Sequence, residues 1–399
     1  MQLILKKLLR AAFDTAVWIT CGTVLALYPV RLLGRLFTGR VVSLWAGTPI
    51  ITMATNARAE RLLGVNAKSL VFTTFYITDA FDYNLSRFTA IPLLGRLVPL
   101  LVFIWACITV DRLHFYCSRG ILPSRGAFTF DFRELYVYRW VGIDVFLWAY
   151  GADVRNQQTA RAMGYPNPCT DCDTPGRYCI CDERQAAENM RKLSRLSRAM
   201  FAGMGEMFGY TPGSIDDLFY WPLDFEADRG EKYRPVFSDP NDDRPLRIVH
   251  ASNHRMFKGT RFLIEAVEQL RAEGESIDLV LVERVPNDRA VELYRSADVI
   301  FDQCLMGSHG YFALEGMALG KPVMCFVRDP ARYLLKPDEC PIINTHVSTL
   351  KEDLRRLARA RAQLPEIGRR SRRYVETYFS LPAFADRLAD AYRRLGIAV

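Results

Sequence analysis

Short apolar runs alternate with longer amphipathic segments along the chain. Runs that predict buried strands recur at 41–45, 71–77, 113–117, 145–150, 247–251, 277–282, 299–301 and 323–327. Segments whose apolar positions predict helices include 97–110, 260–270, 290–297 and 311–319. Such alternation is typical of open α/β sheets, in which ligands bind beyond the carboxyl ends of the strands.

The N-terminal segment 11–30 is mostly apolar and follows three basic residues, Lys6, Lys7 and Arg10. It lacks a small-residue cleavage site near its end, which argues against a signal peptide. Asp14 and several threonines weaken a membrane-spanning helix. We therefore expect a helix lying in the membrane interface, while a spanning helix and a packed first helix stay open as alternatives.

The length and the charge of the chain limit its domain organisation and the kinds of partner that it can bind. At 399 residues the chain exceeds one comfortable core, so two domains are expected. The net charge of +8 is uneven, since residues 1–130 hold 14 Lys and Arg against 5 Asp and Glu. A basic, hydrophobic front half fits an anionic membrane surface, and no nucleic-acid motif is present. Cysteines in apolar settings (Cys21, Cys107, Cys325) favour reduced thiols and a cytoplasmic location. Together with the basic front half, they lead us to expect a protein that is peripheral on the inner face of the plasma membrane.

Four cysteines cluster within thirteen residues around a Thr-Pro-Gly turn. They are Cys169, Cys172, Cys179 and Cys181, in a Cys-x2-Cys and Cys-x-Cys arrangement. Four thiolates at this spacing suit a tetrahedral zinc knuckle, with disulfides or free thiols as the alternatives. A four-cysteine set leaves no open coordination position, so zinc here would be structural.

The segment 299–327 reads as strand, glycine-bearing loop, helix and strand. The amino terminus of its helix, at Gly310 and Tyr311, would favour an anion such as a phosphate. Glu315 on that helix lies where it could accept hydrogen bonds from sugar hydroxyls. An ordinary βαβ crossover with Glu315 on a solvated face is the alternative.

This segment resembles the donor-binding segment of GT-B glycosyltransferases, especially glycosyltransferase family 4. The family segment has a Glu, seven residues, a second Glu and a helix that ends in Gly-x-Pro-Val. Glu315 matches the second Glu, and residues 320–323 match the tail. The first Glu, which contacts the donor sugar in the family, falls on Gly307. The resemblance thus implies ribose recognition by Glu315 and leaves sugar recognition at 307 without support.

The resemblance implies an α/β protein with the GT-B fold, in which two Rossmann-like domains face a cleft and a C-terminal helix crosses back to the N-terminal domain. The expected divisions are an N-terminal helical segment (1–36), an acceptor domain (37–225) with a Cys-rich insertion (165–183), a linker (226–245), a donor domain (246–375) and a crossover helix (376–399).

The strand exit 252–260 resembles the family's diphosphate-binding turn. Lys258 and Gly259 match it well, and Arg255 matches it less well because the family spacing from Arg to Lys is commonly longer. Cations at short range would stabilise a departing diphosphate. We predict donor contacts from Glu315, Gly310, Tyr311, Gly259 and Asn253, and charge stabilisation by Arg255 and Lys258. A solvated helix start is the alternative for the two cations.

In the first domain, a strand that carries His114 and a strand end that carries Asp153 and Arg155 resemble the cleft-facing parts of these enzymes. His114 is accordingly predicted to be catalytic, and Gly47, Asp153 and Arg155 to face the cleft or acceptor. A core histidine and a structural ion pair are the alternatives.

The resemblance implies a hexosyltransferase-type glycosyltransferase that uses a UDP- or GDP-type nucleotide sugar, with retention and without a catalytic metal or other catalytic cofactor. The acceptor is expected to be lipid-linked or a polysaccharide precursor. The alternative is a non-catalytic GT-B binding or scaffold protein, which Gly307 in place of the first Glu supports.

Overall fold

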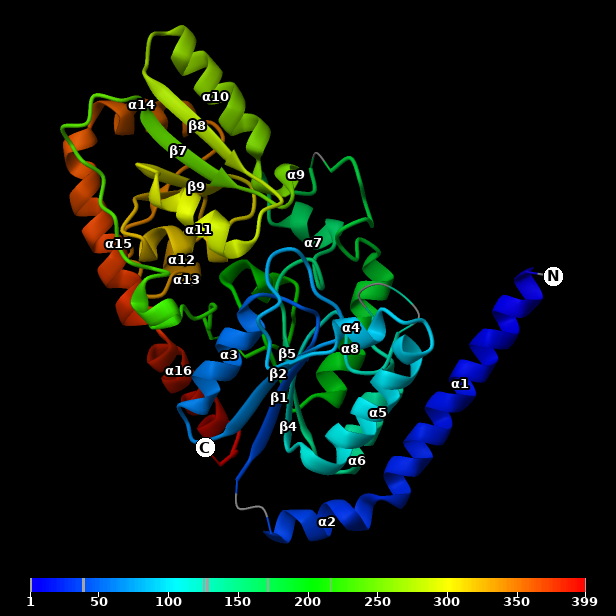
Figure 1. Ribbon diagram of the computed structural model, residues 1–399. Coiled ribbons are helices and arrows are strands. Elements are labelled where there is room, and N and C mark those ends of the chain that lie inside the picture. Colours follow the sequence, from blue (N-terminus) through cyan, green and yellow to red (C-terminus); the bar gives the residue numbers. More distant parts are fainter. Residues whose placement is uncertain are drawn as a thin grey trace.

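The computed structural model describes residues 2–37, 40–124, 126, 129–170, 172–215 and 217–398, with side chains from residue 10 onward. Two parallel sheets, each covered by helices on both faces, stack end to end, and the C-terminal helix returns to the first of them (Figure 1).

The first sheet has the strand order β3-β2-β1-β4-β5-β6, and every pairing is parallel. Its strands are β1 (Val42–Gly47), β2 (Asn66–Val71), β3 (Tyr83–Asn84), β4 (Arg112–Tyr116), β5 (Asp144–Trp148) and β6 (Ala199–Phe201). The prediction of a strand over 71–77 was wrong. Strand β2 ends at Val71, opposite Gly47 at the end of β1, so the residues beyond have no neighbouring strand and form a loop.

Helices cover both faces of this sheet. One face carries α1 (Gln2–Ala26), α2 (Tyr28–Phe37), α5 (Leu94–Thr109), α6 (Phe132–Trp140) and α8 (Glu183–Leu196), and the other carries α3 (Thr52–Arg61) and α16 (Leu381–Arg394). Shorter helices are α4 (Ser86–Thr89), α7 (Gln157–Ala162) and η1 (Gly205–Gly209). Both faces of the strands are therefore buried, which explains why the strands read as continuous apolar runs.

The second sheet has the order β11-β10-β9-β7-β8, again all parallel. Its strands are β7 (Leu246–Ala251), β8 (Ile277–Val282), β9 (Val299–Gln303), β10 (Val323–Cys325) and β11 (Ile343–Asn344). The helices are α9 (Arg255–Lys258), α10 (Thr260–Ala272), α11 (Asn287–Arg295), α12 (Tyr311–Ala318), α13 (Pro330–Tyr333), α14 (Leu350–Arg359) and α15 (Leu364–Tyr378), with 3-10 turns η2 (Ala227–Gly230) and η3 (Arg361–Gln363). Helices α10 and α14 pack on one face, and α11, α12 and α15 on the other.

The chain breaks after α15 and then crosses to the first domain as α16. Ser380 caps α16, because its Oγ accepts a hydrogen bond from the Ala383 amide at 3.4 Å, and Pro382 suits the first turn of a helix. Helix α16 packs beside α3 on the first sheet, where Leu388 is fully buried and the Tyr392 hydroxyl donates to Glu60 at 2.8 Å. The expected crossover helix is thereby confirmed.

Helix α1 packs only in part on the body of the protein. Val17, Cys21 and Val24 are buried against α5, whereas the amino-terminal end of α1 projects outward (Figure 1). Within the described ranges no single helix is long and apolar enough to cross a bilayer, although the pair Arg10–Ala26 and Tyr28–Phe37, bent by 48°, meets the length and composition together.

Candidate functional site

A cavity of about 380 Å³ lies between the two sheets, at the carboxyl ends of β5, β7, β8 and β9. The polar side chains that line it are Tyr150, Arg155, Tyr178, Cys179, Ser252, Asn253, His254, Lys258, Arg284, Asn287, Tyr294, Tyr311 and Glu315. This is the position at which open parallel sheets bind ligands. Three cations (Arg155, Lys258, Arg284) and one carboxylate line the cavity, so its charge favours an anionic ligand.

Lys258 reaches the cavity from the end of α9 and forms an ion pair with Asp302, the fourth residue of β9. Asp302 is fully buried, and its Oδ2 accepts the Gly310 amide at 2.7 Å. Burial alone would raise the pKa of Asp302, but Lys258 and the Gly310 amide outweigh it and hold the pKa below its ordinary value. The Gly310 amide, predicted to bind the donor, is thus already used to fix the loop before α12.

Glu315 lies on α12 and lines the cavity while being 3% exposed. Its Oε1 accepts hydrogen bonds from Asn287 at 2.8 Å and from the Tyr233 hydroxyl at 3.1 Å. Burial raises the pKa of Glu315. With Oε1 held by these two donors, Oε2 is the atom that can accept hydrogen bonds from hydroxyls of a ligand in the cavity.

Three buried polar atoms at the cavity have unused hydrogen-bonding capacity. The Ser252 hydroxyl, the Arg155 Nε and the Asn287 Oδ1 are buried and make no hydrogen bond with any described residue. Buried polar groups are normally satisfied, so these three atoms indicate that a ligand or water completes the site. Beside them His254, whose side chain is exposed, packs its ring 4.3 Å from Tyr178, and the partial desolvation of the ring lowers its pKa.

Gly307 lies against a carboxylate from the other domain. Its φ is +67°, and a Cβ at this position would overlap the Glu206 carboxylate and lie 3.1 Å from Arg328 Nε. Glu206 is 1% exposed, and burial raises its pKa to about 7 against the opposing effect of Arg155 and Arg328. The space that a side chain at 307 would occupy therefore already holds a carboxylate, supplied by η1 from 101 residues earlier in the chain.

His114 does not line the cavity. It lies in the middle of β4, 1% exposed, with its ring stacked 4.0 Å from that of Trp45. Its Nδ1 accepts from Trp148 Nε1 at 3.0 Å, and its Nε2 lies 3.0 Å from the Tyr392 hydroxyl. Burial lowers its pKa. The predicted catalytic role does not fit this geometry, because α16 covers the side chain that the sequence pattern placed at the cleft.

Two other predicted site residues serve the scaffold. Asp153 is buried and accepts the backbone amides of Tyr150, Gly151 and Cys117 at 2.9–3.1 Å, with burial raising its pKa to about 7. Gly47 has φ +101° beside the Arg119 carbonyl. Neither lines the cavity.

Of the predicted cation pair, only Lys258 lines the cavity. The Arg255 side chain is 55% exposed and pairs with Glu283 at 2.6 Å, outside the cavity, because the short helix α9 points it the other way. Gly259 ends α9 with φ +73°, a conformation that favours glycine, and packs against Cys304 instead of lining the cavity. Asn253 does line it and accepts from the Tyr76 hydroxyl at 2.8 Å.

The four clustered cysteines lie near the cavity, which Cys179 lines. None of the four forms a disulfide, and Arg155 Nη1 lies 3.9 Å from Cys179 Sγ. Among the described residues, no group of three or more His, Cys, Asp or Glu is arranged to hold a metal ion. Structural zinc here stays a prediction from the Cys spacing.

The sequence analysis missed several residues of the site. Asp302 could have been found, since it directly follows the apolar run 299–301, just before the glycine loop. Arg284 lies in the connection between β8 and α11, and Asn287 begins α11, and neither belongs to a recognisable motif. Arg284 reaches the cavity from a left-handed backbone conformation with φ +55°. Glu206 had no local signal, because its role depends on a contact with a distant glycine.

Comparison with known proteins identifies the fold. No family model and no curated protein matches the sequence. Anabaena HepE in complex with UDP-glucose is similar in structure, with 11% identity, a TM-score of 0.55, and coverage of 89% of this chain and 100% of that one. Sucrose-phosphate synthase from Thermosynechococcus elongatus shows 12% identity, a TM-score of 0.55, and coverage of 90% and 99%.

WaaG, a glycosyltransferase involved in lipopolysaccharide biosynthesis, shows 12% identity, a TM-score of 0.50, and coverage of 88% and 99%. At such low identity the likeness concerns the fold alone. These neighbours have the GT-B fold, and the chain shares it: two Rossmann-like domains face a cleft, and a C-terminal helix crosses back to the first domain.

Proposed function

We propose that this protein transfers a sugar from a nucleotide-sugar donor to an acceptor hydroxyl. The observation that carries the proposal is the cavity between the two sheets, which is lined by three cations (Arg155, Lys258 and Arg284) and by the carboxylate of Glu315. Structural neighbours named as binding UDP-glucose or as glycosyltransferases add support.

In the proposed complex Lys258 and Arg284 face the diphosphate, and Oε2 of Glu315 accepts hydrogen bonds from the ribose hydroxyls. The anomeric carbon–oxygen bond to the diphosphate breaks, and a bond from the acceptor oxygen to the anomeric carbon forms. The acceptor proton leaves with the diphosphate. Cations in a partly desolvated cavity stabilise the charge that develops on the leaving group, and this requires no strong side-chain base. Donor class (UDP or GDP type), retention, and a lipid-linked or polysaccharide-precursor acceptor belong to this proposal.

Glu206 bears on the alternative of a non-catalytic scaffold, which the missing glutamate at 307 favoured. Its carboxylate fills the space beside Gly307, and its Oε2 lies 3.9 Å from Nη2 of Arg328. We propose that Glu206 occupies this space in place of a side chain at position 307. The glycine is therefore compatible with an intact site.

Calorimetric titration with UDP and GDP tests the proposal. One nucleotide should bind the wild type, and Glu315→Gln should weaken binding about tenfold, since a charge-assisted hydrogen bond is lost while Oε1 can still serve Asn287 and Tyr233. Glu352→Gln, on the exposed outer side of α14, is the matched control and should bind like the wild type. Release of free sugar from the corresponding nucleotide sugar should be as fast in Glu352→Gln as in the wild type, and slower in Glu315→Gln. Absence of binding by both nucleotides would overturn the proposal.

A further inference from the structure

Helix α2, the second helix of the chain, buries an arginine and exposes its apolar side chains, which is the reverse of an ordinary surface helix. In α2, the buried position is Arg31, which is 1% exposed. Its Nε donates to the Val141 carbonyl at 3.0 Å, and its Nη1 donates to the carbonyls of Cys107 at 3.1 Å and Val110 at 2.7 Å. Arg31 thus ties α2 to the ends of α5 and α6 through carbonyls that these helices leave unpaired.

The outer side of α2 is apolar. The five side chains that we call the apolar face are Val30, Leu32, Leu33, Leu36 and Phe37, which are 47–85% exposed. A soluble surface helix normally turns such residues inward, and contiguous exposed apolar residues mark an interaction site. Burying the arginine and exposing the leucines is the arrangement expected of a helix whose outer side contacts a non-aqueous phase.

Aromatic side chains continue this surface onto the neighbouring helices. Trp18 on α1 is 63% exposed, and Trp140 on α6 is 54% exposed, with its ring 4.8 Å from that of Tyr28 at the start of α2. Tryptophan and tyrosine favour the boundary between lipid and water, where the ring is partly buried and the polar atom stays hydrated.

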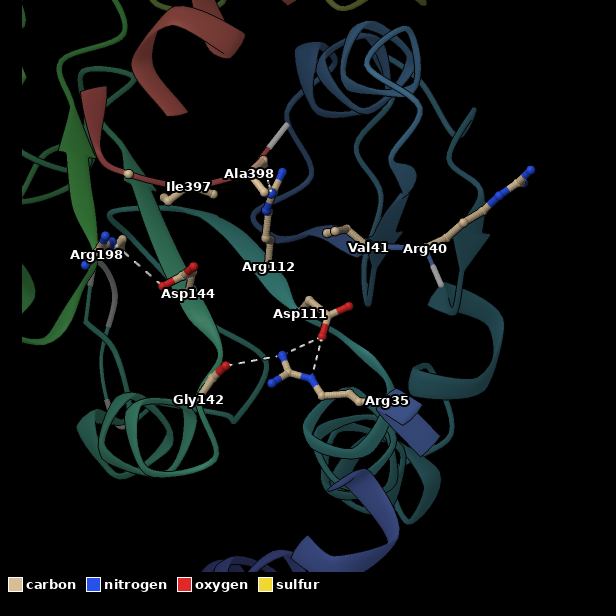
Figure 2. A pocket seen from close by; sticks show the side chains of 11 residues that line it. Arg35, Arg40, Val41, Asp111, Arg112, Gly142, Asp144, Arg198, Ile397 and Ala398 are labelled. Carbon is tan, nitrogen blue, oxygen red and sulfur yellow. Dashed lines mark hydrogen bonds and ion pairs between the residues drawn. The ribbon is translucent and has the colours of Figure 1, made fainter. Parts of the chain in front are cut away.

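Cations gather where α2 ends. A recess of about 620 Å³ beside the helix is lined by four arginines and two aspartates. Figure 2 shows Arg35 paired with Asp111, Arg198 facing Asp144, and Arg40 pointing outward, away from the other labelled side chains. Arg112 is 3% exposed, and its Nη1 lies 4.0 Å from Oε1 of Glu60, so the exposed Arg40 is the cation of this recess that is open to a headgroup. The excess of positive charge next to the apolar face complements anionic headgroups.

We propose that α2, with the adjoining parts of α1 and α6, docks this protein on an anionic lipid bilayer. The leucines enter the headgroup–acyl boundary and the arginines meet lipid phosphates. Helix α2 lies in the interface and does not cross the bilayer, since the buried Arg31 holds it against the first domain. This inference is independent of the proposed sugar transfer.

Vesicle flotation with the full chain tests the proposal, with phosphatidylcholine vesicles compared with vesicles that also contain phosphatidylglycerol. Leu36→Glu should weaken binding about tenfold or more, because burial of one leucine is lost and a negative charge is added. Leu62→Glu is the matched control, since Leu62 is also exposed (56%) but follows α3 on the opposite face of the sheet. It should float like the wild type.

Charge is tested separately. Arg40→Glu should reduce binding to the anionic vesicles about tenfold and leave the weaker binding to phosphatidylcholine unchanged, whereas Arg370→Glu, an exposed arginine on α15, should do neither. Wild-type protein that floats with neither vesicle, or Leu36→Glu that floats like the wild type, would overturn the proposal. So would light scattering that shows a dimer which Leu36→Glu converts to a monomer without loss of vesicle binding, because the apolar face would then join two copies. Nucleotide binding measured on the same variants keeps the two proposals apart.

Discussion

The contact between Gly307 and Glu206 allows a quantitative prediction. Gly307→Ala imposes two costs. A non-glycine residue at φ +67° costs about 1–2 kcal/mol. Its Cβ would also overlap the Glu206 carboxylate, and forcing an extra methyl into a packed interior costs about 1–3 kcal/mol. We therefore expect the substitution to lower the free energy of unfolding by about 2–5 kcal/mol.

The two costs can be separated with Glu206. In a Glu206→Ala background the overlap disappears and Gly307→Ala should cost only about 1–2 kcal/mol, the strain of the backbone alone. Glu206→Gln removes the charge of the side chain but keeps its volume. In that background Gly307→Ala should therefore again lower the free energy of unfolding by the full amount. The coupling energy between Gly307→Ala and Glu206→Ala is thus about 1–3 kcal/mol, within the range for residues in contact.

Urea unfolding followed by circular dichroism is the suitable assay. All six tryptophans lie at or before Trp221, so fluorescence would report mainly on the first domain, whereas Gly307 belongs to the second. The free energy of unfolding of each Gly307→Ala variant is compared with that of the same Glu206 background with Gly307 intact. The comparison holds when the slope of this free energy against urea concentration is the same in both proteins. If Gly307→Ala costs the same in the Glu206→Ala and Glu206→Gln backgrounds, the carboxylate does not occupy this space and the role proposed for Glu206 fails.

Three further predictions follow from buried groups. Lys258→Met should destabilise the protein by about 3–5 kcal/mol in urea unfolding, because it leaves the fully buried Asp302 unpaired, and Lys258→Met with Asp302→Asn should recover most of that loss. Burial raises the pKa of Glu134 to about 8, above its unfolded value of about 4.3, so the folded state retains a proton that the unfolded state releases. Stability should therefore decline from about pH 4 to about pH 8, and Glu134→Gln should reduce this decline when urea midpoints are compared at its two ends. If the cysteine cluster holds zinc, mass spectrometry should find one zinc per protein chain in the wild type and none in Cys172→Ser. Wild-type protein without metal would refute the zinc prediction.

The sequence by itself determined the plan of the second domain. Periodicity is a local property, so the apolar runs of β7, β8 and β9 and the amphipathic pattern of α10 predict those elements directly. Lys258 and Glu315 were placed correctly at the cavity because each lies within one turn or helix of a strand end, and strand ends of a parallel sheet meet at one edge.

Tertiary packing decided what no local pattern encodes. His114 and the cleft were separated by α16, which returns from the far end of the chain to cover β4. The carboxylate at Gly307 came from Glu206 in the other domain, and α2 turned its arginine inward because the carbonyls that Arg31 needs lie at the ends of two distant segments. Buried polar groups must find partners wherever the fold brings them, and those partners are set by long-range contacts. The sequence therefore specified the elements and the glycine loop, and the packing of the two domains specified which side chains meet there.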